Sequence, residues 1–382
     1  MLADMITVLV VRAAIACARW RPEYVLLGAG HRGSHAGAAA LLLIFFLSCS
    51  TSVRAQTITL QTASGGVNIA GVNPSWSAAL GNVNGLGVGS PAAGVAVIST
   101  GVAGGVLYTT RYNIVMNTGG NPGIISAYVS TNFGRSTLLR VLSCYPASGC
   151  GAASSYTAIS SNPAAPTPVI PSPGVSTGTF TASLGVLVSN ANGASVSTGS
   201  DTVTITLVTT RSDGSLRDTD TLAVTVNLQS AVQLQLATSP GGVTISAGSD
   251  YSLNFGNLNG LGINPASGLG VITSGVSGGV IYSSPYLVQP AFSSFSSTTG
   301  TVTIYVSTNF AHPTVLQLRD SADNSSFTAI STSSASQTNI TSSASSSVNI
   351  TRYLGVFVSN ANGVGTFTGS DNAVLTYTLT VP

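Results

Sequence analysis

Two long stretches of this chain repeat each other, block by block and in the same order. Each block returns 170 to 177 positions later, so the repeating unit has the size of a domain and not of a short solenoid unit. The repetition predicts two homologous domains, 56–229 and 230–382, with the boundary near Gln229. Five blocks recur: Gly81–Gly87 as Gly256–Gly262, Val97–Tyr108 as Val271–Tyr282, Tyr128–Phe133 as Tyr305–Phe310, Ser155–Ser160 as Ser326–Ser331, and Leu184–Gly193 as Leu354–Gly363.

The periodicity within both copies is that of β-strands. Thr202–Val208 and Leu375–Val381 alternate Thr with larger apolar residues, which places the apolar side chains on one face of each strand. Asn-Gly pairs, typical of tight turns, begin at positions 84, 192, 259 and 362. No stretch after residue 55 keeps the 3.6-residue period of an amphipathic helix. We therefore predict an all-β chain of two tandem antiparallel β-sandwiches, Ig-like or jelly-roll, with about eight to ten strands each.

The N-terminal region carries an export signal. Ala36–Ser48 is an apolar run of the length found in signal peptides, and it is short for a membrane span. Small residues precede the expected cleavage site after Ala55, while Cys49 offers the alternative of lipoprotein processing. Residues 1–35 are either a long n-region or the product of a misassigned start codon. We predict no integral membrane span in the mature chain.

The mature chain contains two cysteines, Cys144 and Cys150, six positions apart. In an exported protein this spacing favours a local disulfide that closes a small loop. Two free thiols or a metal-binding pair are the alternatives. The first copy has six residues more than the second between Tyr128 and Ser155, and both cysteines lie there. The predicted disulfide therefore belongs to an insertion in one copy.

Charge is sparse throughout the chain. Only 6% of residues are charged, the net charge is +2, and all 12 basic residues are Arg. A balance this small does not favour nucleic acid or an anionic membrane as a partner. Charged side chains normally protect the edge strands of a sheet from pairing with other chains. Here either the edges are closed within each domain, or pairing with other chains is intended.

The residues needed for catalysis are scarce. His312 is the one His of the mature chain, and we expect it to be a solvated loop residue. Gly174–Gly178 and Gly275–Gly279 both match G-x-S-x-G, but a nucleophile elbow needs a strand–turn–helix setting that the sequence does not predict. A hydrolase using Ser277 stays as an alternative. The sequence predicts no enzyme, no cofactor and no metal site.

Four tyrosines repeat at fixed spacing between the copies: Tyr108 and Tyr112 in the first, Tyr282 and Tyr286 in the second. They could line a ligand groove, and polysaccharide is the ligand class that stacks on exposed aromatic rings. They could equally be core residues of a sheet. Exposure of the four rings in one concave patch would distinguish the two interpretations.

Several aspartates also have two interpretations. Asp201 and Asp371 occupy the same place in the two copies and either anchor a ligand or bond the backbone of their own turn. Asp218 and Asp220 lie in the charged segment Arg211–Asp220, which reads as an exposed hairpin tip present in the first copy alone. A calcium site is the alternative for this pair, although it needs more oxygen ligands than the spacing guarantees.

Two short motifs occur in both copies: Phe255-Gly256-Asn257, with Leu80-Gly81-Asn82 in the first copy, and the alternating last strand from Asp371, matched by Asp201. These motifs resemble those of secreted bacterial β-sandwich subunits of the spore-coat U and chaperone–usher pilin type. The resemblance implies domains that assemble by donating strands between subunits. The chain departs from that family in one respect: the usual disulfide is not visible, since the second copy has no Cys.

Together these features predict an exported, non-enzymatic structural or surface protein, secreted or on the cell surface of a bacterium. Self-assembly through strand edges, in a coat, fibre or matrix, is the first hypothesis, with self or other surface proteins as partners. An extracellular module that binds polysaccharide or a surface partner is the alternative.

Overall fold

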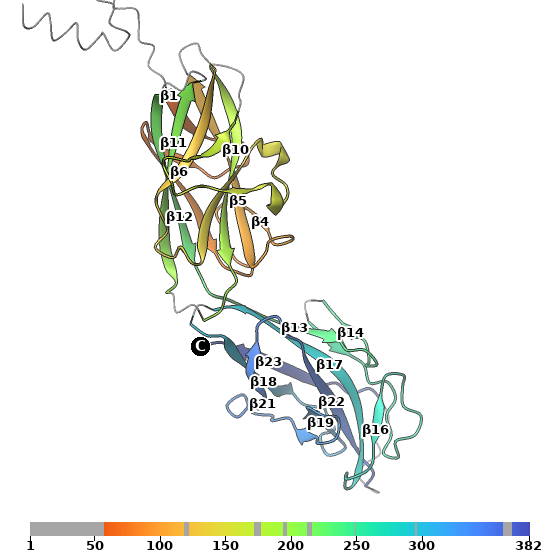
Figure 1. Ribbon diagram of the computed structural model, residues 1–382. Helices are drawn as coiled ribbons and strands as arrows, with labels where there is room; N and C mark the ends of the chain where they lie inside the picture. Colours follow the sequence, from red (N-terminus) through yellow and green to blue (C-terminus); the bar gives the residue numbers. More distant parts are fainter. Residues whose placement is uncertain are drawn as a thin grey trace, which may run out of the picture. The chain divides into compact units, whose positions relative to one another are not determined.

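The computed structural model describes residues 57–117, 122–171, 177–193, 197–211, 216–248, 250–294, 296–361 and 369–382. The predicted export segment, with Ala55 and Cys49, lies outside these residues, as do Ser176 of the first G-x-S-x-G match and the tip 212–215 of the charged hairpin. In the described part, the chain is built of β-strands, with two short 3-10 turns, as the ribbon in Figure 1 shows. No helix among these residues is long and apolar enough to cross a membrane.

The first sandwich consists of twelve strands in two sheets that face each other. One sheet has the order β1-β5-β10-β7-β8, with β4 beside β5, and the other has the order β2-β3-β12-β11-β6-β9. The strands are β1 (Thr57–Thr62), β2 (Ile69–Val72), β3 (Ser75–Val83), β4 (Ala96–Ile98), β5 (Gly105–Asn117), β6 (Gly123–Thr131), β7 (Leu139–Cys144), β8 (Thr157–Ala158), β9 (Thr167–Ile170), β10 (Thr177–Ser189), β11 (Gly199–Arg211) and β12 (Leu216–Leu228).

The second sandwich is built from the strands that follow. Its larger sheet has the order β13-β17-β22-β19-β20, with β16 beside β17; a three-stranded sheet has the order β21-β18-β23, and β14 and β15 form a separate pair. The strands are β13 (Ala231–Thr238), β14 (Ile245–Ser246), β15 (Ser252–Leu253), β16 (Gly270–Ile272), β17 (Gly279–Ser293), β18 (Thr299–Thr308), β19 (Leu316–Ser321), β20 (Thr328–Ala329), β21 (Thr338–Ser345), β22 (Ile350–Ser359) and β23 (Val374–Thr380).

Each sandwich has its own apolar core, formed by the alternation seen in the sequence. Along β11, the inward Val203, Ile205 and Leu207 are at most 2% exposed, and the Thr residues between them face the other way. The two clusters draw on residues 58–228 and on residues 234–379. No described sheet pairs a strand before Gln229 with one after it. The all-β prediction is confirmed, whereas the division into two independent domains stays a prediction.

The strand count of eight to ten per copy is too low. The described residues form twelve strands in the first copy and eleven in the second. The difference comes from pieces of two or three residues, such as β8 and β20, which add a few ladder bonds at sheet edges. Such pieces are too short to show a period of two in the sequence.

The structure contains the predicted disulfide between Cys144 and Cys150. Its loop contains the 3-10 turn η1 (Ala147–Gly149), and a second 3-10 turn, η2 (Ala153–Ser155), follows Cys150. Both cysteines and Tyr156 pack with Leu107 in a small cluster separate from the main core. Leu107 belongs to β5 but is not part of the main core cluster, so the insertion covers apolar surface on the outer face of that sheet.

Candidate functional site

The two sandwiches differ most at strand β12. In the first sandwich β12 lies between two neighbours: it runs antiparallel to β11 and parallel to β3. Its inward side chains fill the core, and all are at most 1% exposed: Leu222, Val224, Val226 and Leu228. Burial of four such side chains contributes roughly 6 to 12 kcal/mol of hydrophobic free energy. Strand β12 therefore completes both the sheet and the core of the first sandwich.

Two carboxylates fix β12 in place. Asp218 Oδ2 accepts a hydrogen bond from the Ile58 backbone N at 2.8 Å. Asp220 is fully buried and accepts from Asn73 Nδ2 at 2.9 Å and from Trp76 Nε1 at 2.8 Å. Burial raises the pKa of the Asp220 carboxyl, the Trp76 bond opposes that change, and the charge of Asp218 adds to it. The carboxylates of Asp218 and Asp220, for which calcium binding was the alternative, thus accept hydrogen bonds from groups of the protein itself.

No described strand of the second sandwich corresponds to β12. Strand β23 corresponds to β11, since Asp371 and Asp201 stand at the same place before their alternating segments, and β23 pairs with β18 alone. The hairpin β14–β15 corresponds to β2–β3 but joins neither sheet. β3 is nine residues long beside β12, whereas β15 has two residues. We call the unpaired side of β23, with its inward residues 373, 375, 377 and 379, the open edge.

The core next to the open edge is incompletely covered. Leu375 and Tyr377 are partly exposed, whereas their counterparts Ile205 and Leu207 in the first sandwich are 2% and 1% exposed. The same holds on the facing sheet: Leu234 and Leu236 of β13 are partly buried, although Ile58 and Leu60 of β1 are at most 1% exposed. A missing strand explains both differences, because a strand at the β12 position would contact both sheets.

A buried polar cluster lies inside the second sandwich. The carboxylate of Asp320 (β19) accepts hydrogen bonds from the Arg352 guanidinium (β22) and from the Tyr286 hydroxyl (β17), the latter at 3.3 Å. The ring of Tyr286 contacts that of Tyr377 on β23 edge to face, with centroids 6.1 Å apart. Burial, then the neighbouring Tyr377 and Asp320, raises the pKa of Tyr286 well above its ordinary value. We call these four residues the polar cluster.

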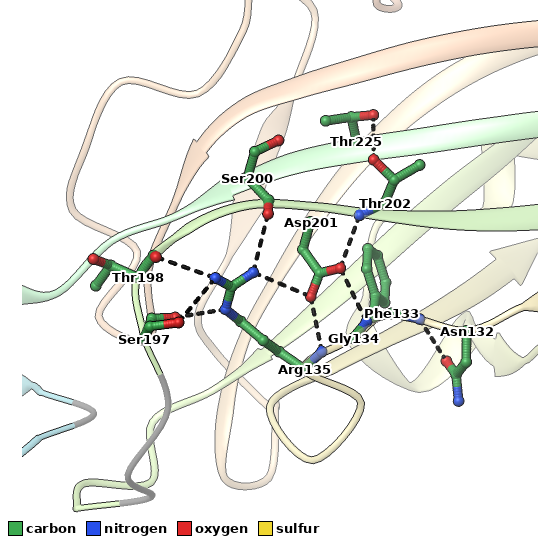
Figure 2. Close-up of polar contacts among 10 residues, drawn as sticks. All are labelled: Asn132, Phe133, Gly134, Arg135, Ser197, Thr198, Ser200, Asp201, Thr202 and Thr225. Atoms are coloured by element: carbon green, nitrogen blue, oxygen red, sulfur yellow. Dashed lines mark hydrogen bonds and ion pairs between the residues drawn. The ribbon is translucent and has the colours of Figure 1, made fainter.

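The repeated aspartates anchor a loop in each sandwich. Asp201 accepts hydrogen bonds from the backbone N–H groups of Gly134, Arg135 and Thr202 at 2.8 to 3.0 Å. Figure 2 shows the Arg135 guanidinium beside it, ion-paired with Asp201 at 3.4 Å and bonded to the carbonyl oxygen of Ser200. Most of the donors belong to the loop after β6, so the aspartate ties that loop to the start of β11. The role of Asp201 is therefore broader than the predicted bond to the backbone of its own turn.

Asp371 does the same in the second sandwich. It accepts from the backbone N–H groups of Ala311, His312 and Asn372, and its Oδ2 lies 3.0 Å from His312 Nδ1. Burial raises the pKa of the Asp371 carboxyl, but the hydrogen bonds from Ala311, His312 and Asn372 outweigh it, and the net pKa is lowered. The expectation of a solvated His312 is therefore wrong in part: its ring is 41% exposed but is bonded to Asp371.

The four repeated tyrosines do not line a surface groove. Tyr108, Tyr112, Tyr282 and Tyr286 are 0 to 3% exposed and belong to the two cores. The Tyr108 hydroxyl accepts from Asn84 N and donates to Asn84 O, each at 3.0 Å, and Tyr282 bonds Asn259 in the same way. The alternation of residues along the strands that carry these tyrosines did not indicate which face of the strand points into the core. Polysaccharide binding thus loses the residues on which it depended.

The remaining candidates contribute little chemistry. Ser277 is exposed in the turn between β16 and β17, with no helix following it, so the context of a nucleophile elbow is absent around it. In the described part of the chain, no three His, Cys, Asp or Glu side chains gather into a group that could hold a metal ion.

Comparison with known proteins gives structural likenesses but no sequence match. No protein-family profile matches the chain, and no curated protein sequence matches it. The CooA pilin subunit of enterotoxigenic Escherichia coli is 16% identical and matches 45% of this chain and 99% of its own, with a TM-score of 0.25. The CsuC–CsuE chaperone–tip adhesion subunit complex of Acinetobacter baumannii matches 85% of this chain and 100% of its own, at 8% identity and a TM-score of 0.33.

The pilin subunit and the tip adhesion subunit are the kinds of subunit that the sequence motifs of this chain resemble. A family 123 glycoside hydrolase from Clostridium perfringens also matches, over 46% of this chain and 27% of its own, at 10% identity and a TM-score of 0.20.

Proposed function

We propose that this protein is an exported, non-enzymatic structural or adhesive subunit of a bacterial surface assembly. Its second domain, residues 230–382, accepts a β-strand from another subunit at the open edge. The single observation that carries this proposal is the open edge: among the described residues one side of β23 is unpaired, whereas β12 pairs the same side of β11 in the first sandwich. The partner is thus a polypeptide segment with apolar residues at alternate positions, and no polysaccharide is required.

The chemistry of the accepted strand follows from β12. Its main chain would bond the unpaired N–H and C=O groups of β23, which otherwise present a template for pairing with other chains. Its alternate apolar side chains would cover Leu375 and Ala373, as Leu222 and Val224 stand opposite Ile205 and Val203 of β11. By the register of β12, the accepted strand would run antiparallel to β23.

The proposal is tested with residues 56–382 and a synthetic peptide of residues 218–229, which contains the inward residues of β12. We expect saturable binding and slower hydrogen exchange in β23 and in β14–β15. Leu375→Lys should abolish binding, because it places a charge on the inward side of the open edge. Thr376→Lys is the matched control, because Thr376 faces the opposite way, and it should bind normally. Both variants are first checked for retained hydrogen-exchange protection of β17 and β22, the central strands of the second sandwich.

Sedimentation velocity over a range of concentrations provides the second measurement. Oligomers that form with the wild type and not with Leu375→Lys would mean that the strand comes from another copy of this chain. A monomer that binds the peptide would assign the strand to a different subunit. A chain that neither oligomerises nor protects β23 from exchange in the presence of peptide would refute the proposal.

A further inference from the structure

Among residues 218–228 of strand β12, one buried residue is not apolar. Asp220 stands opposite Leu207 in the register of β12 with β11, two residues before the apolar series that begins at Leu222. It is fully buried and is satisfied by Trp76 Nε1 and Asn73 Nδ2. Thus the strand that completes the first sandwich has a hydrogen-bond acceptor at one end of its inward face, and the indole N–H of Trp76 is aimed at it.

The second sandwich has hydrogen-bonding groups at the matching positions. Tyr251 stands five residues before Gly256, as Trp76 stands five before Gly81, and the residue is 41% exposed. Among the described residues no hydrogen bond to the Tyr251 hydroxyl is found. Tyr377 takes the place of Leu207, each six residues after its repeated aspartate. Both tyrosines carry a donor where the accepted strand would place its counterpart of Asp220.

The interior beside that position also carries charged side chains in place of small neutral ones. Arg352 replaces Ala182, because both stand two residues before the repeated Leu-Gly pair, Leu354-Gly355 and Leu184-Gly185. Asp320 replaces Ser143, because these two residues pair in register with Leu354 and Leu184, respectively. The hydroxyl of Tyr377 is hydrogen-bonded to Tyr286 within the polar cluster. An apolar side chain placed here would cover the polar cluster with hydrocarbon and leave the hydroxyl of Tyr251 without a partner from the strand. Burial of a polar group without a hydrogen bond is unfavourable.

We propose that the strand bound at the open edge carries a hydrogen-bond-accepting side chain, Asp or Asn, two residues before its first inward apolar residue. Tyr251 and the polar cluster receive this side chain. The proposal rests on the proposed function, because it presumes that a strand is accepted. It assigns Tyr251 and Tyr377 as specificity determinants and defines the partner segment as acceptor-x-apolar-x-apolar-x-apolar.

The same side chain fixes the register of the strand. A slip by one residue turns every inward side chain to the outside. A slip by two residues in one direction places an apolar side chain against Tyr251, and in the other direction moves the acceptor over Leu375. One register therefore satisfies both the polar and the apolar parts of the site, and strands with uniformly apolar inward faces are disfavoured.

The test compares peptides of residues 218–229 for binding to residues 56–382. Asp220→Asn retains the acceptor and should bind like the parent peptide. Asp220→Leu should bind about three- to tenfold more weakly, the effect of a lost hydrogen bond to a buried polar site. Thr221→Leu is the matched control, since it adds the same hydrocarbon on the outward face, and should bind like the parent. Against the Tyr251→Phe protein, the difference between the parent and Asp220→Leu peptides should shrink.

The outcomes separate this inference from the proposed function. If no peptide binds, strand acceptance itself is refuted. If Asp220→Leu binds as tightly as the parent or more tightly, the open edge accepts strands but does not select an acceptor, and the inference is overturned. An equal loss with Thr221→Leu would also overturn it, because the effect would not depend on the inward face.

Discussion

The open edge makes a quantitative prediction about two equivalent core positions. Ile205 in β11 and Leu375 in β23 stand at the same place in the two copies, and both face inward. Strand β12 covers Ile205, with Leu222 opposite it in register, and the residue is 2% exposed. No described strand covers Leu375 in the same way. Replacing each residue by Ala therefore measures how much the neighbouring strand adds to the free energy of unfolding at that position.

The expected magnitudes differ for a physical reason. Ile205→Ala opens a cavity in a closed core and should lower the free energy of unfolding of the first sandwich by about 2 to 5 kcal/mol. Leu375→Ala removes a side chain that water already reaches, so no closed cavity forms. Its cost should be about 1 to 2 kcal/mol, the transfer free energy of a partly buried leucine. With a bound peptide of residues 218–229, the cost should rise towards the value for Ile205→Ala.

The measurement is denaturant unfolding of residues 56–382 with two probes. Trp76 is the one Trp in this part of the chain and lies against Asp220 of β12, so its fluorescence reports on the first sandwich. Hydrogen exchange followed by mass spectrometry reports on β23 in the second. The outward neighbours provide controls, and Thr376→Ala should have little effect. If Leu375→Ala alone costs as much as Ile205→Ala without any peptide, the edge is not open and the reasoning is wrong.

Three further perturbations have defined outcomes. Removing the disulfide with Cys144→Ser and Cys150→Ser should lower the stability of the first sandwich by about 2 kcal/mol, because its ring is small, and leave exchange in β23 unchanged. Arg352→Met should destabilise the second sandwich by about 3 to 5 kcal/mol, because it leaves the buried Asp320 without its ion-pair partner. Adding Asp320→Leu should recover most of the lost stability. A double variant no more stable than the single one would contradict this interpretation. Because the folded pKa of Asp371 is lowered, its bonds stabilise the fold above the ordinary carboxyl value of 3.8, and this contribution is lost as the pH falls through the lower folded value. The protection factors of amides in the loop around His312, which correct for the intrinsic pH dependence of exchange, should therefore fall at low pH in the wild type and not in Asp371→Asn.

Local features of the sequence were sufficient for much of the fold. The alternation in Thr202–Val208 predicted a half-buried strand, and β11 includes this segment with Val203 and Ile205 inward. The six-residue spacing of Cys144 and Cys150 predicted the disulfide that the structure contains. Both predictions depend on residues close together in the chain, where period and ring size set the geometry.

The predicted site was less successful, because burial depends on neighbours that are far away in sequence. The spacing of Tyr108 and Tyr282 fitted a groove or a core equally well, and their burial is decided by the facing sheet. Asp220 looked like part of an exposed hairpin tip. Its partners Asn73 and Trp76 lie more than 140 residues before it, and nothing in the local pattern points to them.

The sequence by itself determined that the chain is a duplicated all-β protein, because repetition and a period of two can be read directly along the chain. Only the tertiary structure decided that β12 completes the first sandwich and that one side of β23 is unpaired among the described residues. The order of strands in a sheet follows from pairing between distant segments, as in the parallel contact of β12 with β3. A strand shows its inward face through its own residues, but the identity of its neighbours is fixed when the sheets assemble.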